Sequence, residues 1–145
     1  MTFKYKNVYL DDTSLIAGPY EAKGPLKKYF DKCYDDLYFG EDSWEKAEIK
    51  LVRDSISMIL KKNGIKKEEI DLVIGGDLLN QITTTSSSVV DNSISFLGIY
   101  SACATFISGL IILSNFIDKD LIKEGICITS SHNLTSEKQF RFPVE

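Results

Sequence analysis

The chain has 145 residues, of which 43% are hydrophobic and 26% charged, with a formal net charge of −4. This length fits one domain, and the apolar content is enough to build a core. Acidic and basic residues are mixed along the chain, which argues against a nucleic-acid binder, because such a protein would show a clustered basic face. The cysteines Cys33, Cys103 and Cys127 have no paired spacing. We therefore expect neither a disulfide framework nor a zinc site, and a reducing compartment fits.

The longest apolar run, residues 106–117, is interrupted by serine, glycine and asparagine. It is far shorter than the ~20 residues that a membrane-spanning helix needs. Met1 is not followed by a charged leader and an apolar core, so we read no secretion signal. These features predict a protein of the cytoplasmic type without a transmembrane segment.

Two elements are expected before residue 40. Residues 13–19 read as a short strand that a Gly-Pro pair ends. Residues 25–38 carry apolar and aromatic side chains at helical spacing, among them Leu26, Phe30 and Leu37. This spacing predicts an amphipathic helix that packs on the surface of the core.

The clearest helix is expected over residues 44–63, where apolar side chains recur near the helical period. Asp42 can serve as its N-cap, with Glu45 three residues later, in a variant of the capping box. Asn63 and Gly64 predict a left-handed stop at the other end.

Buried strands alternate with helices in the rest of the chain. Strands are predicted at residues 71–75, 96–100 and 125–129, with helices at residues 83–95 and from Cys103 through the apolar run. This alternation implies an α/β fold with parallel strands and right-handed crossovers. Residues 135–145 are polar and look like an unfinished element.

Three polar clusters follow the predicted strands and therefore fall on one edge of the expected sheet. They are Asp77, Asn80 and Gln81; Ser101, Cys103 and Thr105; and Ser130, Ser131, His132 and Asn133. In open α/β sheets, ligands bind at the carboxyl ends of the strands. Together the clusters predict a ligand-binding site, while each cluster alone also fits ordinary turn chemistry.

Cys103 lies where a strand meets the start of a helix. Unpaired N–H groups and the helix dipole favour a thiolate there, which is one route to a reactive cysteine. The alternative is a small buried thiol that behaves as a hydrophobic side chain. His132 is the only histidine; it could be a general base, a hydrogen-bond donor to a ligand, or a structural residue.

Six segments of the chain resemble the stage V sporulation protein AD family, which is part of the thiolase-like superfamily. They are residues 24–26, 44–63, 76–81, 101–105, 130–133 and 137–143. The resemblance implies a thiolase-like α/β fold, in which each half of a duplicated αβαβα architecture has a mixed, mostly parallel sheet flanked by helices. It implies that residues 1–145 are the N-terminal half-domain, with a fifth strand after Glu145 and a C-terminal half that is absent from this chain.

The resemblance also implies a function. The family is understood to bind dipicolinic acid and to support its uptake into the developing spore. It does so at the cytoplasmic face of the spore inner membrane, as a peripheral member of a membrane transport assembly. The implied partners are dipicolinic acid and the other subunits of that assembly, without nucleic acid, and the implied full-length state is a homodimer. No cofactor is implied, apart from calcium that accompanies dipicolinate.

The superfamily also suggests an alternative function. Cys103 matches the position of the nucleophile in condensing enzymes, which would make the chain a thiolase-like or ketoacyl-synthase-like acyltransferase. In those enzymes the remaining catalytic residues lie in the second half.

A dianionic ligand such as dipicolinate needs hydroxyls, helix N-termini and cations. The hydroxyl clusters and His132 would provide some of these hydrogen-bond donors. Lys138 and Arg141 are candidate counter-charges for the ligand. Asp77 has the wrong charge for a dianion unless it faces a cation.

Overall fold

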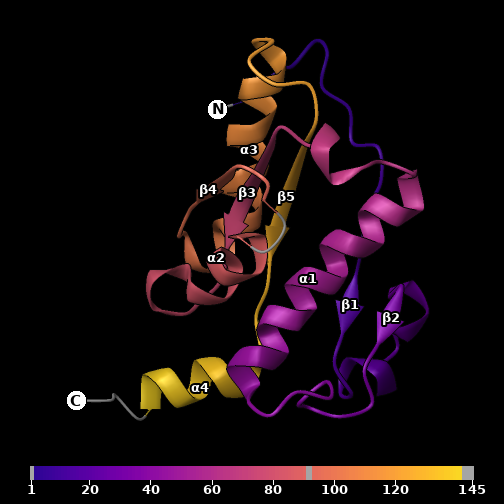
Figure 1. Cartoon of the computed structure of the whole chain (residues 1–145), viewed down its shortest axis with the longest axis vertical. Helices are drawn as coiled ribbons and strands as arrows, with labels where there is room; N and C mark the ends of the chain where they lie inside the picture. Colours follow the sequence, from indigo (N-terminus) through magenta and orange to yellow (C-terminus); the bar gives the residue numbers. More distant parts are fainter. Residues whose placement is uncertain (1, 91–92, 142–145) are drawn as a thin grey trace.

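A parallel sheet with helices on both faces forms the body of the chain (Figure 1). The computed structural model describes residues 2–90 and 93–141. The sheet contains β3 (Leu72–Gly76), β4 (Phe96–Gly98) and β5 (Gly125–Thr129), in the order β4-β3-β5. Both pairs are parallel, so the α/β fold and the strand predictions at residues 71–75 and 125–129 are confirmed. The predicted strand at residues 96–100 is shorter, because β4 ends at Gly98.

The alternation of side chains along the strands explains how the sheet is covered. Val73 and Ile128 belong to the core cluster that also includes Val52 and Ile56 of α1 (Trp44–Asn63). Ile74, the neighbour of Val73, lies beside Gly109 of α3 (Thr105–Asp118) on the opposite face. Successive strand residues point to opposite faces, so α1 covers one face of the sheet and α3 covers the other.

Helix α1 has the bounds that the sequence predicts, but its N-cap differs. The Ser43 hydroxyl accepts a hydrogen bond from the Lys46 backbone N–H at 3.2 Å, so Ser43 is the N-cap and the prediction of Asp42 was wrong. Asp42 lies one residue too early and instead pairs with the Lys46 side chain at 2.8 Å. The predicted left-handed stop is confirmed, because Gly64 has φ 65° and donates back to Leu60 and Lys61.

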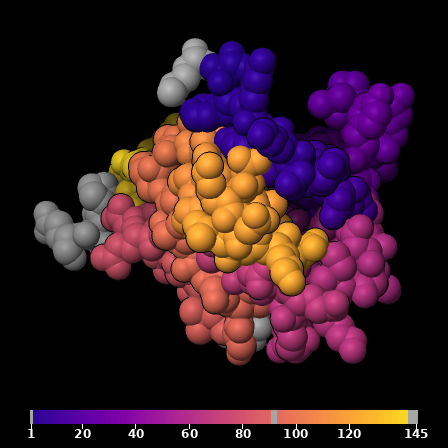
Figure 2. Space-filling view, turned by 90° about the horizontal axis from the view of Figure 1, so that it is seen from above, coloured from indigo at the N-terminus to yellow at the C-terminus, as the bar shows by residue number. Residues whose placement is uncertain are grey.

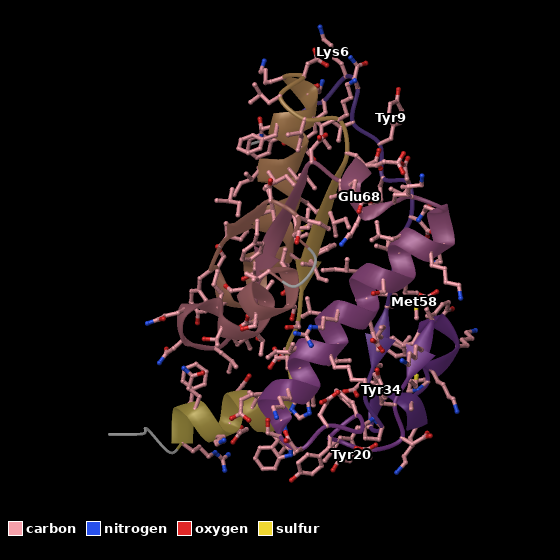
Figure 3. All side chains as sticks on the ribbon, in the orientation of Figure 1. Lys6, Tyr9, Tyr20, Tyr34, Met58 and Glu68 are labelled. Carbon is pink, nitrogen blue, oxygen red and sulfur yellow. The ribbon has the colours of Figure 1, made fainter. Side chains whose placement is uncertain are left out.

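The predicted helix at residues 25–38 was wrong. A 3₁₀ turn at Lys27–Tyr29 is followed by the short strand β2 (Lys32–Cys33), which pairs in parallel with β1 (Ile16–Ala17). The backbone N–H groups that a helix would use internally instead bond to β1 and the residue before it: Asp31 donates to Leu15 and Tyr34 to Ala17. Side chains also tie this unit to α1, because Tyr34 and Lys32 both bond to Asp54. Figure 3 labels Tyr34, which lies beside α1.

The two remaining helices of the described residues pack against α1. Helix α2 (Thr83–Val90) is shorter than the predicted helix at residues 83–95, and residues 91–92 lie outside the described part. Helix α4 (Asn133–Arg141) replaces the unfinished element expected at residues 135–145, of which residues 142–145 are not described. Further 3₁₀ turns occur at Glu21–Lys23, Lys67–Glu69, Asn80–Ile82 and Ala102–Ala104.

The N-terminal segment lies across the end of α3, as the indigo and orange atoms show in Figure 2. The Lys6 backbone N–H donates to Asp118 at 2.8 Å, and Asn115 donates to the Tyr5 hydroxyl at 3.2 Å. Within residues 2–90 and 93–141, we find no helix with both the length and the apolar character that crossing a membrane requires.

Candidate functional site

The first polar cluster follows β3, and its acid is buried. Asp77 is 1% exposed. Its carboxylate accepts hydrogen bonds from the Leu79 N–H at 2.9 Å and from the Thr85 N–H and hydroxyl, both at 2.7 Å. These bonds hold a turn in which Gln81 has φ 59°, a left-handed conformation that residues other than glycine rarely adopt. Asn80 and Gln81 themselves are exposed.

The second cluster lies between β4 and α3. Thr105 is buried; its hydroxyl accepts from the Ser101 N–H at 3.0 Å and donates to the Ala102 carbonyl at 2.8 Å. This closes a tight turn in which Ala102 has φ 47°. Cys103 is exposed at the middle of the turn, so the alternative of a buried thiol was wrong. No side chain caps the N-terminus of α3, so its first N–H groups and dipole favour negative charge there.

The third cluster joins β5 to α4. His132 is 4% exposed, and its Nε2 lies 2.8 Å from the Leu37 carbonyl oxygen. A carbonyl can only accept, so Nε2 carries the proton in this bond. The ring also meets Phe39 edge-on, with centroids 5.4 Å apart. Ser131 and Asn133 are exposed, whereas Ser130 is half-buried.

Glu48 on α1 is a site residue that the sequence analysis missed. It is 0% exposed, and its Oε1 accepts from the Ser130 hydroxyl at 2.8 Å. Burial is the largest cause that raises the pKa of Glu48, and the nearby Asp77 adds to it, while hydrogen bonds from the Ser130 hydroxyl and the His132 backbone N–H lower it; the net pKa is about 7. One signal in the sequence could have found it: Glu48 lies four residues from both Trp44 and Val52, inside the apolar stripe of the helix.

The structure brings the first and third clusters together through Glu48 and through neighbouring strands. The Thr129 hydroxyl donates to the Gly76 carbonyl at 3.0 Å, and the Asn80 N–H donates to Gln139 of α4 at 3.2 Å. The second cluster follows β4, which lies on the other side of β3 from β5. The predicted residues that reach the surface at this edge are Asn80, Gln81, Ser101, Cys103, Ser131 and Asn133.

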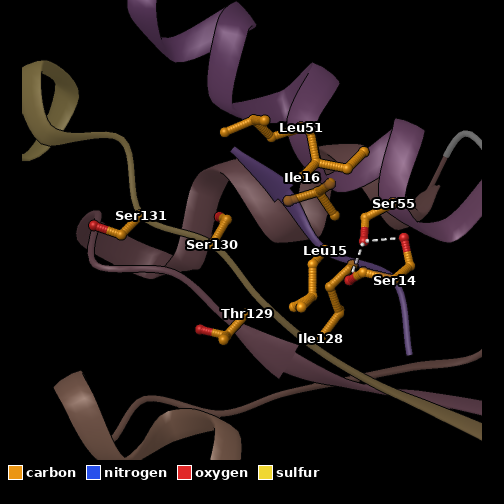
Figure 4. A pocket seen from close by; sticks show the side chains of 10 residues that line it. Ser14, Leu15, Ile16, Leu51, Ser55, Ile128, Thr129, Ser130 and Ser131 are labelled. Atoms are coloured by element: carbon orange, nitrogen blue, oxygen red, sulfur yellow. Dashed lines mark hydrogen bonds between the residues drawn. The ribbon is translucent and has the colours of Figure 1, made fainter. Parts of the chain in front are cut away.

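A cavity of about 160 Å³ lies between β1 and β5 (Figure 4). Of the predicted site residues, only Ser130 and Ser131 line it, beside Ser14, Ser55 and several apolar side chains. The Ser55 hydroxyl donates to Ser14 at 3.2 Å. In the described residues β1 pairs only with β2, and β5 only with β3, so the cavity lies between two strand edges.

The candidate counter-charges lie on α4 and are already paired. Lys138 Nζ is 2.6 Å from Glu45, and Arg141 Nε is 2.5 Å from Glu137. Both cations line an open groove of about 440 Å³ beside Trp44. In the part of the chain that the structure describes, no group of three or more His, Cys, Asp or Glu side chains could hold a metal ion.

Comparisons with known proteins agree with one another. The family model described as Stage V sporulation protein AD matches residues 1–145. The chain is also similar to the Stage V sporulation protein AD of Bacillus subtilis (strain 168), with 39% identity over 138 residues. The aligned region is 95% of this chain and 41% of that relative, so the chain spans well under two thirds of the relative's length.

Proposed function

Because the chain belongs to the Stage V sporulation protein AD family, we propose that it binds dipicolinic acid and supports its uptake into the developing spore. In this proposal it acts as a peripheral part of a membrane transport assembly and has the thiolase-like half-domain fold. The observation that carries the proposal is the row of exposed polar side chains at the carboxyl edge of the sheet, where α3 and α4 also begin. Helix N-termini and hydroxyl donors suit a small dianion.

The predicted site residues divide into two groups under this proposal. The residues of the first group reach the surface and would contact the ligand: the exposed Asn80, Gln81, Ser101, Cys103, Ser131 and Asn133, and the half-buried Ser130. The buried residues Asp77, Thr105 and His132 each form at least one hydrogen bond within the protein and shape the three turns. Calcium would be chelated by the carboxylates of dipicolinate, since the described residues offer no cluster of metal-ligating side chains.

Calorimetric titration with dipicolinate, with and without calcium, tests this function. We expect saturable binding that Ser131→Ala and Asn133→Ala each weaken by about 1 kcal/mol, the scale of one hydrogen bond. Ser57→Ala is the matched control, because Ser57 is an exposed serine on α1. Binding that all three substitutions leave unchanged would remove the carboxyl edge as the site.

The exposed thiol of Cys103 favours acyl transfer as a second candidate function. The thiol lies in the turn before α3, directly after Ala102 with its left-handed backbone, and strained residues of this kind cluster at active sites. In this reaction the Cys103 thiolate would attack an acyl thioester, the acyl group would move to sulfur, and the original thiol would leave. Mass spectrometry after incubation with acyl-coenzyme A tests it, with Cys33 and Cys127 as internal controls.

A further inference from the structure

The buried face of α1 contains a carboxyl group that is only partly satisfied. Glu48 uses Oε1 for the Ser130 hydroxyl, whereas Oε2 has no hydrogen-bond partner among the described residues. Other buried polar atoms without a described partner come from α1, from α2 and from the start of α4: Trp44 Nε1, Thr84 Oγ1, His132 Nδ1, Thr135 Oγ1 and Ser136 Oγ. Helix α1 packs against both α2 and α4. Because native proteins satisfy nearly all buried polar groups, such a concentration marks a candidate functional region.

Within residues 2–90 and 93–141, the groups that shift the pKa of Glu48 include no cation. Asp77 faces it from the turn after β3, and Glu45 lies on the same helix. The lysine of α4, Lys138, is paired with Glu45. Helix α2 contributes only hydroxyl and apolar side chains, and the loop before α4 contributes the Ser130 hydroxyl and the His132 N–H. Burial and Asp77 therefore favour the protonated acid, with a pKa of about 7.

We propose that Glu48 is a positioning residue for residues 130–133, and that a proton on its carboxyl group controls which way the Ser130 hydroxyl points. When Glu48 is ionised, Ser130 must donate its proton to Oε1, and only oxygen lone pairs remain for a ligand. When Glu48 takes up one proton from solvent, its own O–H can donate to the Ser130 oxygen. The Ser130 proton is then free to bond to a carboxylate of the ligand.

This inference rests on the proposed function and has a consequence for affinity. Protonation removes a negative charge next to the site and turns Ser130 into a donor, and both changes favour a dianion. If only the protonated form binds, affinity for dipicolinate falls about tenfold between pH 6 and pH 8. The affinity of a Glu48→Gln variant is independent of pH over this range, because its amide accepts and donates in the same way as the protonated acid.

The first test needs no ligand. Trp44 is the only tryptophan and lies one turn before Glu48, so its fluorescence reports on this region. We expect an emission change with a midpoint near pH 7 in the native chain and no such change in Glu48→Gln. Histidines ordinarily titrate in the same pH range, so His132→Gln is the control and should keep the transition. In the native chain, the hydrogen bond from the Ser130 hydroxyl lowers the pKa of Glu48. Ser130→Ala removes this bond, so the midpoint should move upward.

The second test measures dipicolinate affinity at pH 6 and pH 8 in the native chain and in Glu48→Gln. An emission transition that survives in Glu48→Gln, or a native midpoint that Ser130→Ala does not move, overturns the positioning role. Native affinity that is equal at both pH values overturns the coupling to the ligand. If the emission results are as expected but dipicolinate does not bind at either pH, the positioning role stands and the proposed function fails.

Discussion

The hydroxyl of Ser130 lies 2.8 Å from Oε1 of Glu48, and this hydrogen bond joins the carboxyl end of β5 to the buried face of α1. Both elements contribute to the core cluster, through Ile128 and Val52. The bond therefore connects the most apolar part of the molecule to the loop that begins α4. A change at Glu48 should affect both the stability of the fold and the geometry of this loop.

We expect the stability of the native chain to fall as pH rises from about 4.5 to about 7, because the pKa of Glu48 is raised from 4.5 to about 7 in the fold. Between these values the folded state binds more protons than the unfolded state, so the contribution is present at low pH and lost above pH 7. From pH 5 to pH 8, the unfolding free energy of the native chain should fall by about 2–3 kcal/mol more than that of Glu48→Gln. Urea denaturation at both pH values measures this, and equal losses would exclude the buried acid as the cause.

Asp77→Ala should destabilise the chain by about 2–4 kcal/mol, because buried donors of Thr85 and Leu79 would lose their acceptor. Asp36→Ala is the control: Asp36 is exposed and accepts one hydrogen bond from the Tyr38 N–H, so its loss should cost about 1 kcal/mol or less. Chemical denaturation compares the two. Equal, small effects of the two substitutions would mean that Asp77 does not stabilise its turn. Asp77 would then again be a candidate for contact with the ligand.

Gly109 allows α3 to approach the sheet closely. A Cβ atom at this position would lie 2.7 Å from the Cys127 sulfur, so Gly109→Ala should destabilise the chain by about 1–3 kcal/mol in spite of better helix propensity. Burial raises the pKa of the Cys127 thiol to about 12, so the sulfur stays protonated in the experiment. Cys127→Ala in the same chain should recover most of the loss, and strictly additive effects in a double-mutant cycle would argue against this contact.

The outer side of α3 exposes apolar side chains, with Ile107 57% and Phe106 39% exposed. A helix that is apolar nearly all round expects burial on both sides, so we predict that the isolated chain self-associates through this surface. Sedimentation velocity should show species larger than a monomer, and Ile107→Lys should shift them to monomer. Leu121→Lys is the control, since Leu121 is 68% exposed beyond the end of the helix. A native chain that is a cooperatively melting monomer would contradict the prediction.

The elements that the sequence predicted well are those in which local and tertiary signals agree. Helix α1 has a continuous apolar stripe and a glycine stop, and β3 and β5 are apolar runs of the length of a strand. The prediction of a helix at residues 25–38 failed because it assumed that the apolar side chains there are buried, whereas Leu26 and Tyr29 are exposed. The helical spacing of apolar residues in this segment therefore does not correspond to a buried helix face. The backbone of the segment is instead hydrogen-bonded to residues in and next to β1.

The sequence predicts which edge of the sheet carries the candidate site, but it does not predict which side chains of that edge are exposed. The strand ends identify the carboxyl edge of the sheet, which depends only on topology. Burial decides which side chains can reach a ligand, and it depends on α1 and α4 packing over the edge. Asp77 and His132 are buried for this reason. A charged residue such as Glu48 is expected on the solvent-exposed face of a helix. Only its position within the apolar stripe of α1 indicates that it is buried.

Dipicolinate affinity of the native chain, compared with that of Cys103→Ala, tests the central claim of ligand binding most directly. If Cys103 only lines the site, losing this small exposed thiol should weaken binding by no more than about 1–2 kcal/mol, and no acyl group should appear on Cys103 after incubation with acyl-coenzyme A. A native chain that does not bind dipicolinate, but carries an acyl thioester on Cys103 that Cys103→Ala abolishes, would contradict the account and support the acyltransferase.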